Sequence, residues 1–405
     1  MRVISLCGAP SFRLNPRAAM RTLDRYVLRN FLEPFALCFS AFLGILLIFD
    51  LNDNLNDFAE GKSRWKLIAV YYLHQLPHFI LLSMPLGLLL ALLYSLSKMS
   101  RSNEIISMLT AGRSVQRILL PLFFSSIAAT ALCLCLNYEL APQADALHRA
   151  DMARIKLGEA AADERNVIRA HLMKDRMTNR VWFTQLMRLN NASLEAVHIT
   201  QLNASGQPVT RWYAASAVYL PSSGNWVLSR GRQVSFDAQG NIEGTMEDWT
   251  KIEGPGHMRV MEGWSETPYR LSSSRMEAEQ LSVPQLREYL EANADFPEAQ
   301  LAAFRTHLHY RWALPFTCLT VVFIAAPLGI VFSRRAVLAS VGSSIFIFFG
   351  YLFLMFLFLA LGKGNHLPPA VAAWTPNATL LAIGLCLLYL RSTNRDFPKI
   401  SFRRK

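Results

Sequence analysis

Two groups of long apolar segments, within residues 31–136 and 305–391, enclose a polar stretch at residues 137–304. A helix that crosses the apolar core of a bilayer needs roughly 20 mostly apolar residues. The order therefore predicts three membrane spans, an inserted polar domain and three further spans. The segments that meet or approach the required length are residues 34–51, 67–97, 115–136, 312–332, 337–361 and 369–390.

The second of these segments is too long for one straight crossing. Pro77 and Pro85 can kink it, because proline removes a backbone hydrogen bond from the helix. Its first third carries polar side chains at Tyr71, His74 and His78. We therefore expect this third to extend at a tilt along the membrane interface.

Charge beside the spans predicts their orientation. Residues 1–30, residues 392–405 and the short loops after spans two and four are basic, whereas the first loop, residues 50–66, holds four acids against three cations. Cytoplasmic loops carry an excess of lysine and arginine. The N-terminal segment at 1–30, expected to include an interfacial helix, and the tail at 392–405 are therefore predicted to be cytoplasmic. The polar domain is predicted to be periplasmic.

The net charge of +12 has the same origin. Residues 138–304 carry 17 basic and 21 acidic side chains, a net of −4, and the rest of the chain carries 24 and 8, a net of +16. The basic excess thus follows the membrane topology, with some attraction to anionic headgroups. Nucleic-acid binding, which such a charge would suggest in a soluble protein, is not expected.

All six cysteines lie in the N-terminal segment or in the spans, and no pair has the spacing of a zinc site. The polar domain has no cysteine, and it is long enough to be stabilised by its own core. The N-terminus lacks the apolar region of a cleaved signal peptide, so we expect the first span to act as an uncleaved signal. Met20 is an alternative start to Met1.

The polar domain is predicted to be mostly β-structure. Short stretches rich in alternating apolar residues are separated by turns that contain glycine and asparagine, which is typical of an antiparallel sandwich or barrel. Two helices are expected to flank the strands, at residues 141–158 and 281–294, and the second begins with the capping box Ser282–Gln285. The expected strands are residues 194–202, 209–214, 217–220, 226–229 and 233–237.

The loop between spans two and three carries the clearest functional signal. Residues 99–113 predict a short helix parallel to the membrane, which Ser100 or Ser102 can cap and which Gly112 ends. Its one acid, Glu104, stands among basic flanks, so the helix could dock onto a cytoplasmic partner. The alternative is an interfacial helix in which Glu104 only complements the positive end of the helix dipole.

Several stretches resemble the LptF/LptG (YjgP/YjgQ) family of lipopolysaccharide-export permeases, and the chain is somewhat more similar to the LptG branch. The resemblance covers about residues 20–395. The stretches that carry it are Glu104-Ile-Ile-Ser-Met108 with Ala111-Gly112, Leu23-Asp-Arg-Tyr26, Leu140-Ala-Pro142, Tyr213-Ala-Ala, Trp226-Val-Leu, Arg311, Pro315-Phe316, Pro327-Leu-Gly-Ile330, Leu367-Pro-Pro369, Trp374 and Pro376-Asn377.

This resemblance implies a bacterial inner-membrane subunit with six spans and a periplasmic jellyroll-like domain. Two paralogous permeases would pair above an ATPase dimer, which would bind the ATP and magnesium, so no cofactor is expected in this chain. Lipopolysaccharide would leave the outer leaflet for periplasmic bridge proteins. The coupling helix would dock with the ATPase through Arg101, Glu104, Ile105, Met108 and Gly112.

Six residues are candidates for substrate contact. Lys62, Arg64, Lys66 and Arg311 lie near the outer ends of spans and could pair with lipid phosphates, although basic side chains also snorkel there without a ligand. Trp212 and Trp226 could line a slot for acyl chains, or simply fill the core. The family often has a lysine at the outer end of span one, where this chain has Asp50 and Asp53 instead.

Other chemistry is not expected. His74 and His78 share a spacing of four residues, but no third metal ligand stands near them, and Gly61-Lys62-Ser63 lacks the preceding glycine of a phosphate loop. No catalytic set appears within the spans. Two alternatives to lipopolysaccharide export are export of another amphiphilic lipid and a membrane-anchored periplasmic scaffold without ATP coupling.

Overall fold

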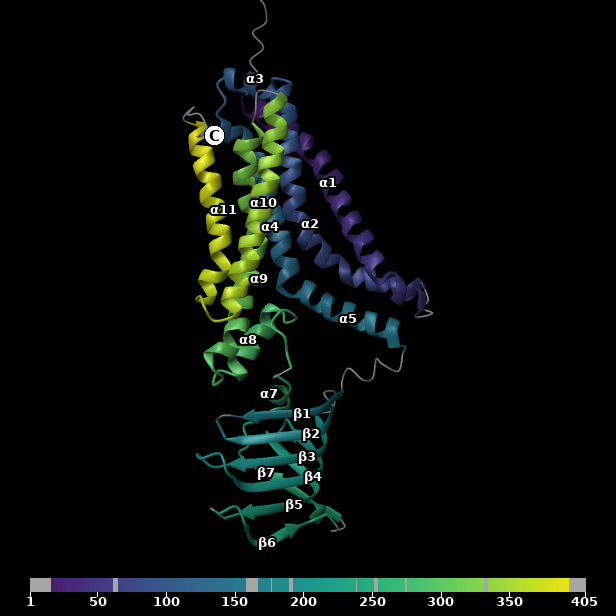
Figure 1. The fold of residues 1–405 in the computed structure, drawn as a ribbon. Helices are drawn as coiled ribbons and strands as arrows, with labels where there is room; N and C mark the ends of the chain where they lie inside the picture. Colours follow the sequence, from purple (N-terminus) through teal and green to yellow (C-terminus); the bar gives the residue numbers. More distant parts are fainter. Residues whose placement is uncertain are drawn as a thin grey trace, which may run out of the picture.

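The computed structural model describes residues 16–60, 65–157, 167–175, 177–188, 192–237, 239–250, 254–273, 275–330 and 334–392. Within these residues, six helices are long and apolar enough to cross a membrane, which confirms the predicted spans. They form an upright bundle, and an antiparallel sheet lies beyond one end of it (Figure 1). The six helices are α1 (Pro16–Glu60), α2 (Trp65–Arg101), α4 (Val115–Cys135), α9 (Glu298–Gly329), α10 (Arg334–Lys363) and α11 (Pro369–Ser392).

Helices α2 and α9 form the centre of the bundle, and small residues let their neighbours pack closely. A Cβ added at Gly329 of α9 would lie 2.8 Å from Leu96 Cβ on α2, and one added at Gly384 of α11 would lie 2.8 Å from Phe323 Cβ on α9. One buried polar cluster also joins three helices, because the Tyr351 hydroxyl on α10 donates to Asn377 Oδ1 on α11 at 3.0 Å. The Asn377 amide donates in turn to the carbonyl of Ala313 on α9 at 2.6 Å.

Helix α1 is a single helix of 45 residues, which differs from the prediction. The expected interfacial helix and first span are continuous, and residues 50–60, expected to be a loop, are helical. Polarity indicated a loop here, but no glycine or proline interrupts the helix between Gly44 and Glu60. The Asn54 amide donates to the carbonyl of Asp50 at 2.9 Å, a contact along the helix.

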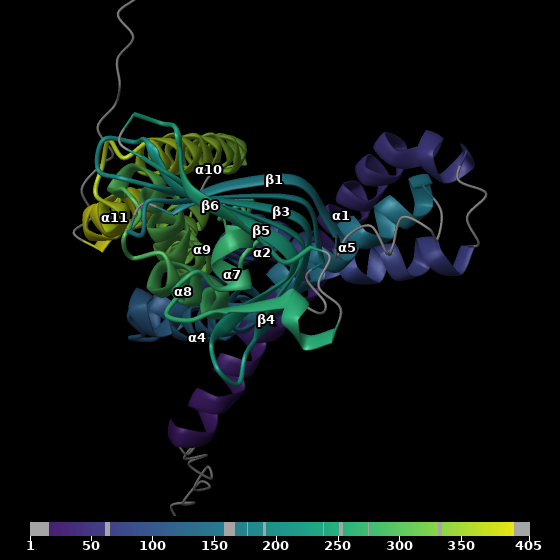
Figure 2. The same ribbon diagram turned by 90° about the horizontal axis from the view of Figure 1, so that it is seen from below.

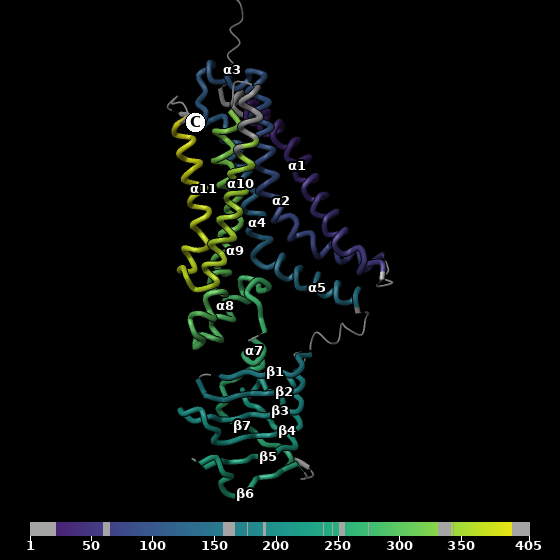
Figure 3. Tube along the Cα trace, viewed as in Figure 1, coloured from purple at the N-terminus to yellow at the C-terminus, as the bar shows by residue number. Residues whose placement is uncertain are grey.

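The outer end of α1, the first third of α2 and helix α5 (Ala141–Leu157) form an arm that projects from the bundle (Figures 1 and 2). As its two prolines predict, α2 bends between its ends (Figure 3). Phe58, Tyr71 and Ile155 form the apolar centre of the arm. His74 on α2 pairs with Asp151 on α5 at 2.6 Å.

Helix α4 continues into α5 through a single π-helical turn, η1 (Leu136–Leu140). The predicted continuation of span three into a flanking helix is therefore confirmed. Asn137 in this turn is fully buried, and its amide donates to the carbonyl of Arg311 on α9 at 2.6 Å. The turn thus fixes the outer end of α4 to α9.

In the described part of the inserted domain, the strands form one seven-stranded antiparallel sheet, ordered β1-β2-β3-β4-β5-β6, with β7 also paired to β5. Figure 2 shows the sheet curving around α7 (Pro268–Ser273). An all-β domain is confirmed, but the described strands form one folded sheet rather than two separate ones. The strands are β1 (Val167–Asp175), β2 (Arg180–Arg188), β3 (Ser193–Leu202), β4 (Pro208–Leu220), β5 (Asn225–Phe236), β6 (Ile242–Asp248) and β7 (Met258–Met261), and the turn η2 (Gly254–His257) precedes β7.

A crease crosses this sheet and explains two errors of prediction. Ala170, Ala196 and Arg230 have positive φ of 48°, 50° and 49°, on β1, β3 and β5. The strand pairing skips each of them, so the alternation of buried and exposed residues shifts there. The sequence pattern therefore suggested two short strands where β4 is continuous, and two more where β5 is continuous.

Helix α8 (Val283–Ala292) links the sheet to the bundle. Its predicted capping box is confirmed, because Ser282 and Gln285 bond each other's backbone. The helix ends at Ala292, and α9 begins separately at Glu298. Tyr289 on α8 stacks on Phe304 of α9, with ring centroids 3.7 Å apart.

Candidate functional site

A short helix, α3 (Glu104–Thr110), lies across the end of the bundle that is opposite the sheet (Figure 1). The start of α1 and the end of α11 lie at this same end. The predicted helix at 99–113 is thus shorter than expected, because α2 continues to Arg101. The helical spacing of apolar residues in this stretch could not show where α2 ends and α3 begins.

The N-terminal end of α3 differs from the prediction, whereas its C-terminal end agrees with it. The N-terminal residue is Asn103, which has a left-handed φ of 58° and makes no side-chain cap, so the predicted serine caps are wrong. Ser100 is instead buried at the end of α2. Gly112 has φ of 81°, and the next amide donates to the carbonyl of Met108, which confirms the predicted glycine stop.

The side chains of α3 divide between the bundle and the surface. Ile105 is fully buried in the main apolar core, and Met108 and Leu109 pack against that core. Arg101 and Gly112 are exposed, and Ile106 is 38% exposed. Among the predicted coupling residues, Ile105 and Met108 therefore anchor the helix, whereas the other three are accessible to a partner.

The Glu104 carboxylate is held by two hydroxyl groups. Tyr26 on α1 donates to Oε2 at 3.0 Å, and Ser102 donates to Oε1 at 2.8 Å. Beside this contact, Arg117 on α4 donates to Asp24 on α1 at 2.9 Å. Sequence spacing gave no signal for either contact to α1, because the partners are 78 and 93 residues apart.

The four basic substrate candidates are not in one place. Lys62 and Arg64 lie outside the described residues. Lys66 is exposed near the start of α2, on the projecting arm. Arg311 belongs to the junction between α9 and η1: it donates to Asn137 Oδ1 at 3.1 Å and to the carbonyl of Glu279 at 2.6 Å. These contacts give Arg311 a structural role in this conformation.

The two tryptophan candidates face the inside of the folded sheet. Trp226 is fully buried, and its indole N–H donates to the carbonyl of Glu266 at 2.6 Å. Trp212 is partly buried against Trp264, with ring centroids 5.3 Å apart. The segment that carries Trp264 and Glu266 fills the curve of the sheet, so Trp226 belongs to the core, as the structural alternative predicted.

An ion pair that the sequence analysis missed supports this core. Arg180 donates to both oxygens of Glu266, at 3.0 and 2.8 Å, and Glu266 is fully buried. The guanidinium of Arg180 also lies 4.3 Å from the centre of the Trp264 ring. Arginine and glutamate 86 residues apart give no pairing signal in one sequence.

The two histidines considered as metal ligands do not act together. His74 is paired with Asp151, and His78 is exposed on the next turn of α2. Across the described ranges, no group of three or more possible ligands is placed to hold a metal ion.

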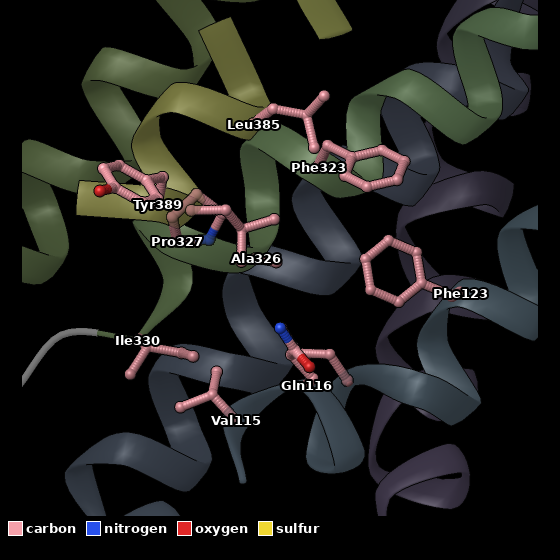
Figure 4. A pocket seen from close by; sticks show the side chains of 11 residues that line it. Val115, Gln116, Phe123, Phe323, Ala326, Pro327, Ile330, Leu385 and Tyr389 are labelled. Atoms are coloured by element: carbon pink, nitrogen blue, oxygen red, sulfur yellow. The ribbon is translucent and has the colours of Figure 1, made fainter. Parts of the chain in front are cut away.

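A pocket of about 410 Å³ opens between α4, α9 and α11 (Figure 4). Its walls are apolar apart from Gln116 and Tyr389, and no charged side chain lines it. The pocket therefore lacks groups that could pair with a phosphate. The other lining residues are Val115, Leu119, Phe123, Phe323, Ala326, Pro327, Ile330, Leu385 and Leu388.

Across the described residues, six apolar helices, an inserted antiparallel sheet and a short helix at the opposite end define a multi-pass membrane protein with a β domain. The model of the family described as lipopolysaccharide export system permease LptF/LptG matches residues 25–390. The chain therefore belongs to the LptF/LptG family, whose members are permease subunits of the inner membrane. No curated protein matches the chain.

Proposed function

We propose that this lipopolysaccharide-export permease receives force from a separate ATPase dimer at α3 and passes lipid toward the sheet at its other end. On this proposal α3 and both termini are cytoplasmic, and the sheet is periplasmic. The basic excess beside the α3 end and the net acidity of residues 138–304 support that orientation.

The observation that carries the proposal is the anchoring of α3. Ile105 is buried in the bundle core, while Glu104, held by two hydroxyls, stays partly exposed. A fixed carboxylate on an anchored helix suits a basic groove on a partner, because charge complementarity sets orientation without requiring a large interface. Since Ile105 joins α3 to the core, a push on α3 would reach the spans.

The proposed lipid path begins at the exposed face of α1. Only 11% of the residues in the most apolar stretch of α1 are buried, compared with 72% in α2, so α1 is open to lipid or to a paralogous permease. Lys66, with Lys62 and Arg64 before it, would meet lipid phosphates at the outer surface. Trp212 would contact acyl chains with the part of its side chain that Trp264 leaves uncovered, before periplasmic bridge proteins accept the lipid.

Co-purification tests the ATPase contact. Glu104→Ala should reduce the amount of ATPase recovered with the permease in mild detergent by at least tenfold, while the protein remains folded in membranes. Thr110→Ala is the matched control, because Thr110 is exposed on the same helix and bonds only within it. Equal recovery with both variants would favour the scaffold alternative, which has no ATP coupling.

Photo-crosslinking tests the substrate. Probes at positions 62, 66 and 212 in living cells should capture lipopolysaccharide. If the same probes capture only phospholipid, the substrate is another amphiphile or the lipid path lies elsewhere.

A further inference from the structure

Helix α1 is attached to the rest of the protein mainly at its two ends. Figures 1 and 3 show α1 and α2 diverging before they meet again at the arm, and Phe39 of α1 still lies close to Gly87 of α2. The exposed side chains of the middle of α1 include Leu37 at 74%, Ile45 at 47% and Ile48 at 68%. Apart from Phe35 and Phe39, which pack against the bundle core, few packing contacts restrain this middle part.

The inner end of α1 is fixed to the coupling region by polar and apolar contacts. Tyr26 donates to Glu104, and Asp24 pairs with Arg117, as described above. Val27 and Phe31, which follow on the buried face, are each 1% exposed and belong to the same apolar core as Ile105. Four residues within two turns thus link α1 to both sides of the coupling loop.

The outer end of α1 is fixed to the arm. Phe58 packs edge-on against Tyr71 of α2, with ring centroids 5.4 Å apart. The Tyr71 hydroxyl donates to Asp50 at 3.1 Å, and Asp57 pairs with Lys156 of α5 at 2.9 Å. A helix of this length spans about 68 Å. It therefore connects the α3 end directly to the arm.

We propose that Tyr26 is a positioning residue for Glu104, and that the inner end of α1 transmits movement of α3 to the outer arm. This inference rests on the proposed function, because it takes α3 as the place where the ATPase acts. A carboxylate has about four acceptor positions, and the two hydroxyls occupy one on each oxygen. The remaining positions are left to a basic partner in a fixed orientation.

The Asp24–Arg117 pair carries the second part of the transmission. The side chains of Asp24 and Arg117 are 35% and 28% exposed, so solvent screens the pair only in part. It joins α1 to the beginning of α4, directly after the coupling loop. When α3 and the beginning of α4 move relative to α2, Tyr26 and this pair oblige α1 to move with them, rather than letting the loop shift alone.

Tyr26→Phe is the direct test, because it keeps the ring and removes only the donating hydroxyl. In the purified exporter with its ATPase, in lipid vesicles, the variant should release roughly 2- to 10-fold less lipopolysaccharide per ATP hydrolysed, the range expected for one hydrogen bond. ATPase co-purification should stay within about twofold of wild type, because Glu104 itself is intact. Glu33→Gln is the control: it removes an exposed pair with Arg29 on α1 that does not involve α3.

A charge exchange tests the Asp24–Arg117 pair. Asp24→Lys and Arg117→Glu should each lower release per ATP, and the double variant should restore at least half of the loss. Wild-type release with Tyr26→Phe, or no recovery in the double variant, would overturn the inference. If Glu104→Ala abolishes coupling while Tyr26→Phe does not change it, the proposed function stands and this inference fails.

Discussion

The burial of Ile105 leads to a quantitative prediction for Ile105→Ala. The substitution removes three carbons from a side chain that is fully buried in the bundle core. At about 0.8 kcal/mol for each buried carbon, the attachment of α3 should weaken by about 2.4 kcal/mol, or roughly 50-fold. The cavity left behind would increase this cost, because such replacements in cores reach about 5 kcal/mol.

The effect should be local, since α3 is a single short helix that can leave the bundle without unfolding the spans. Amide hydrogen exchange, read by mass spectrometry in detergent, measures this local opening. We expect exchange in α3 to rise by roughly 50-fold or more. Ile106→Ala is the matched control, because Ile106 is exposed. Equal exchange in the two variants would refute the anchoring of α3 by Ile105.

Three further predictions concern the sheet and its junction with the bundle. Glu266→Gln leaves the largely buried guanidinium of Arg180 without its charge partner, so the free energy of unfolding should fall by about 3–5 kcal/mol, as thermal unfolding followed by tryptophan fluorescence would measure. The control is Glu247→Gln, which breaks an exposed pair with Arg259 and should lower the free energy of unfolding by less than about 1 kcal/mol. Gly231→Ala should destabilise the sheet by about 1–3 kcal/mol or more, because an added Cβ would collide with a carbonyl oxygen of β4, and an unchanged melting temperature would contradict this. A hydrogen bond from Lys363 lowers the pKa of Glu279 below its ordinary 4.5, so this pair stabilises the fold above that pH and its contribution is lost as the pH falls. Because Glu279 is exposed, Glu279→Gln should cost at most about 1 kcal/mol at neutral pH and progressively less as the pH falls below 4.5, as unfolding across this pH range would measure.

The membrane spans could be predicted because length and polarity alone define them. A bilayer requires about 20 apolar residues in a row, and this signal does not depend on distant contacts. The strands were harder, since the crease at Ala196 and Arg230 interrupts their alternation. The strands β1 and β2 were missed because apolar residues also occupy positions that are not buried, Leu172 and Phe183 among them, and they hide the period of two.

In the candidate site, too, local sequence signals could be predicted, whereas contacts between distant residues could not. Glu104 stood out as one acid in a basic loop, and Gly112 as a helix stop, because both signals are local. Tyr26 did not stand out, since its role depends on the folding of α1 against α3. Trp226 was ambiguous for a related reason: an aromatic residue in a strand predicts burial, but not whether protein or lipid covers it.

The most direct test of the account is ATP-dependent release of lipopolysaccharide by the purified exporter in lipid vesicles, compared between wild type and Glu104→Ala. The account predicts that wild type releases lipopolysaccharide only with ATP and that the variant, folded and correctly inserted, releases at least tenfold less. Release by the variant at the wild-type rate would contradict the central claim that force enters at α3.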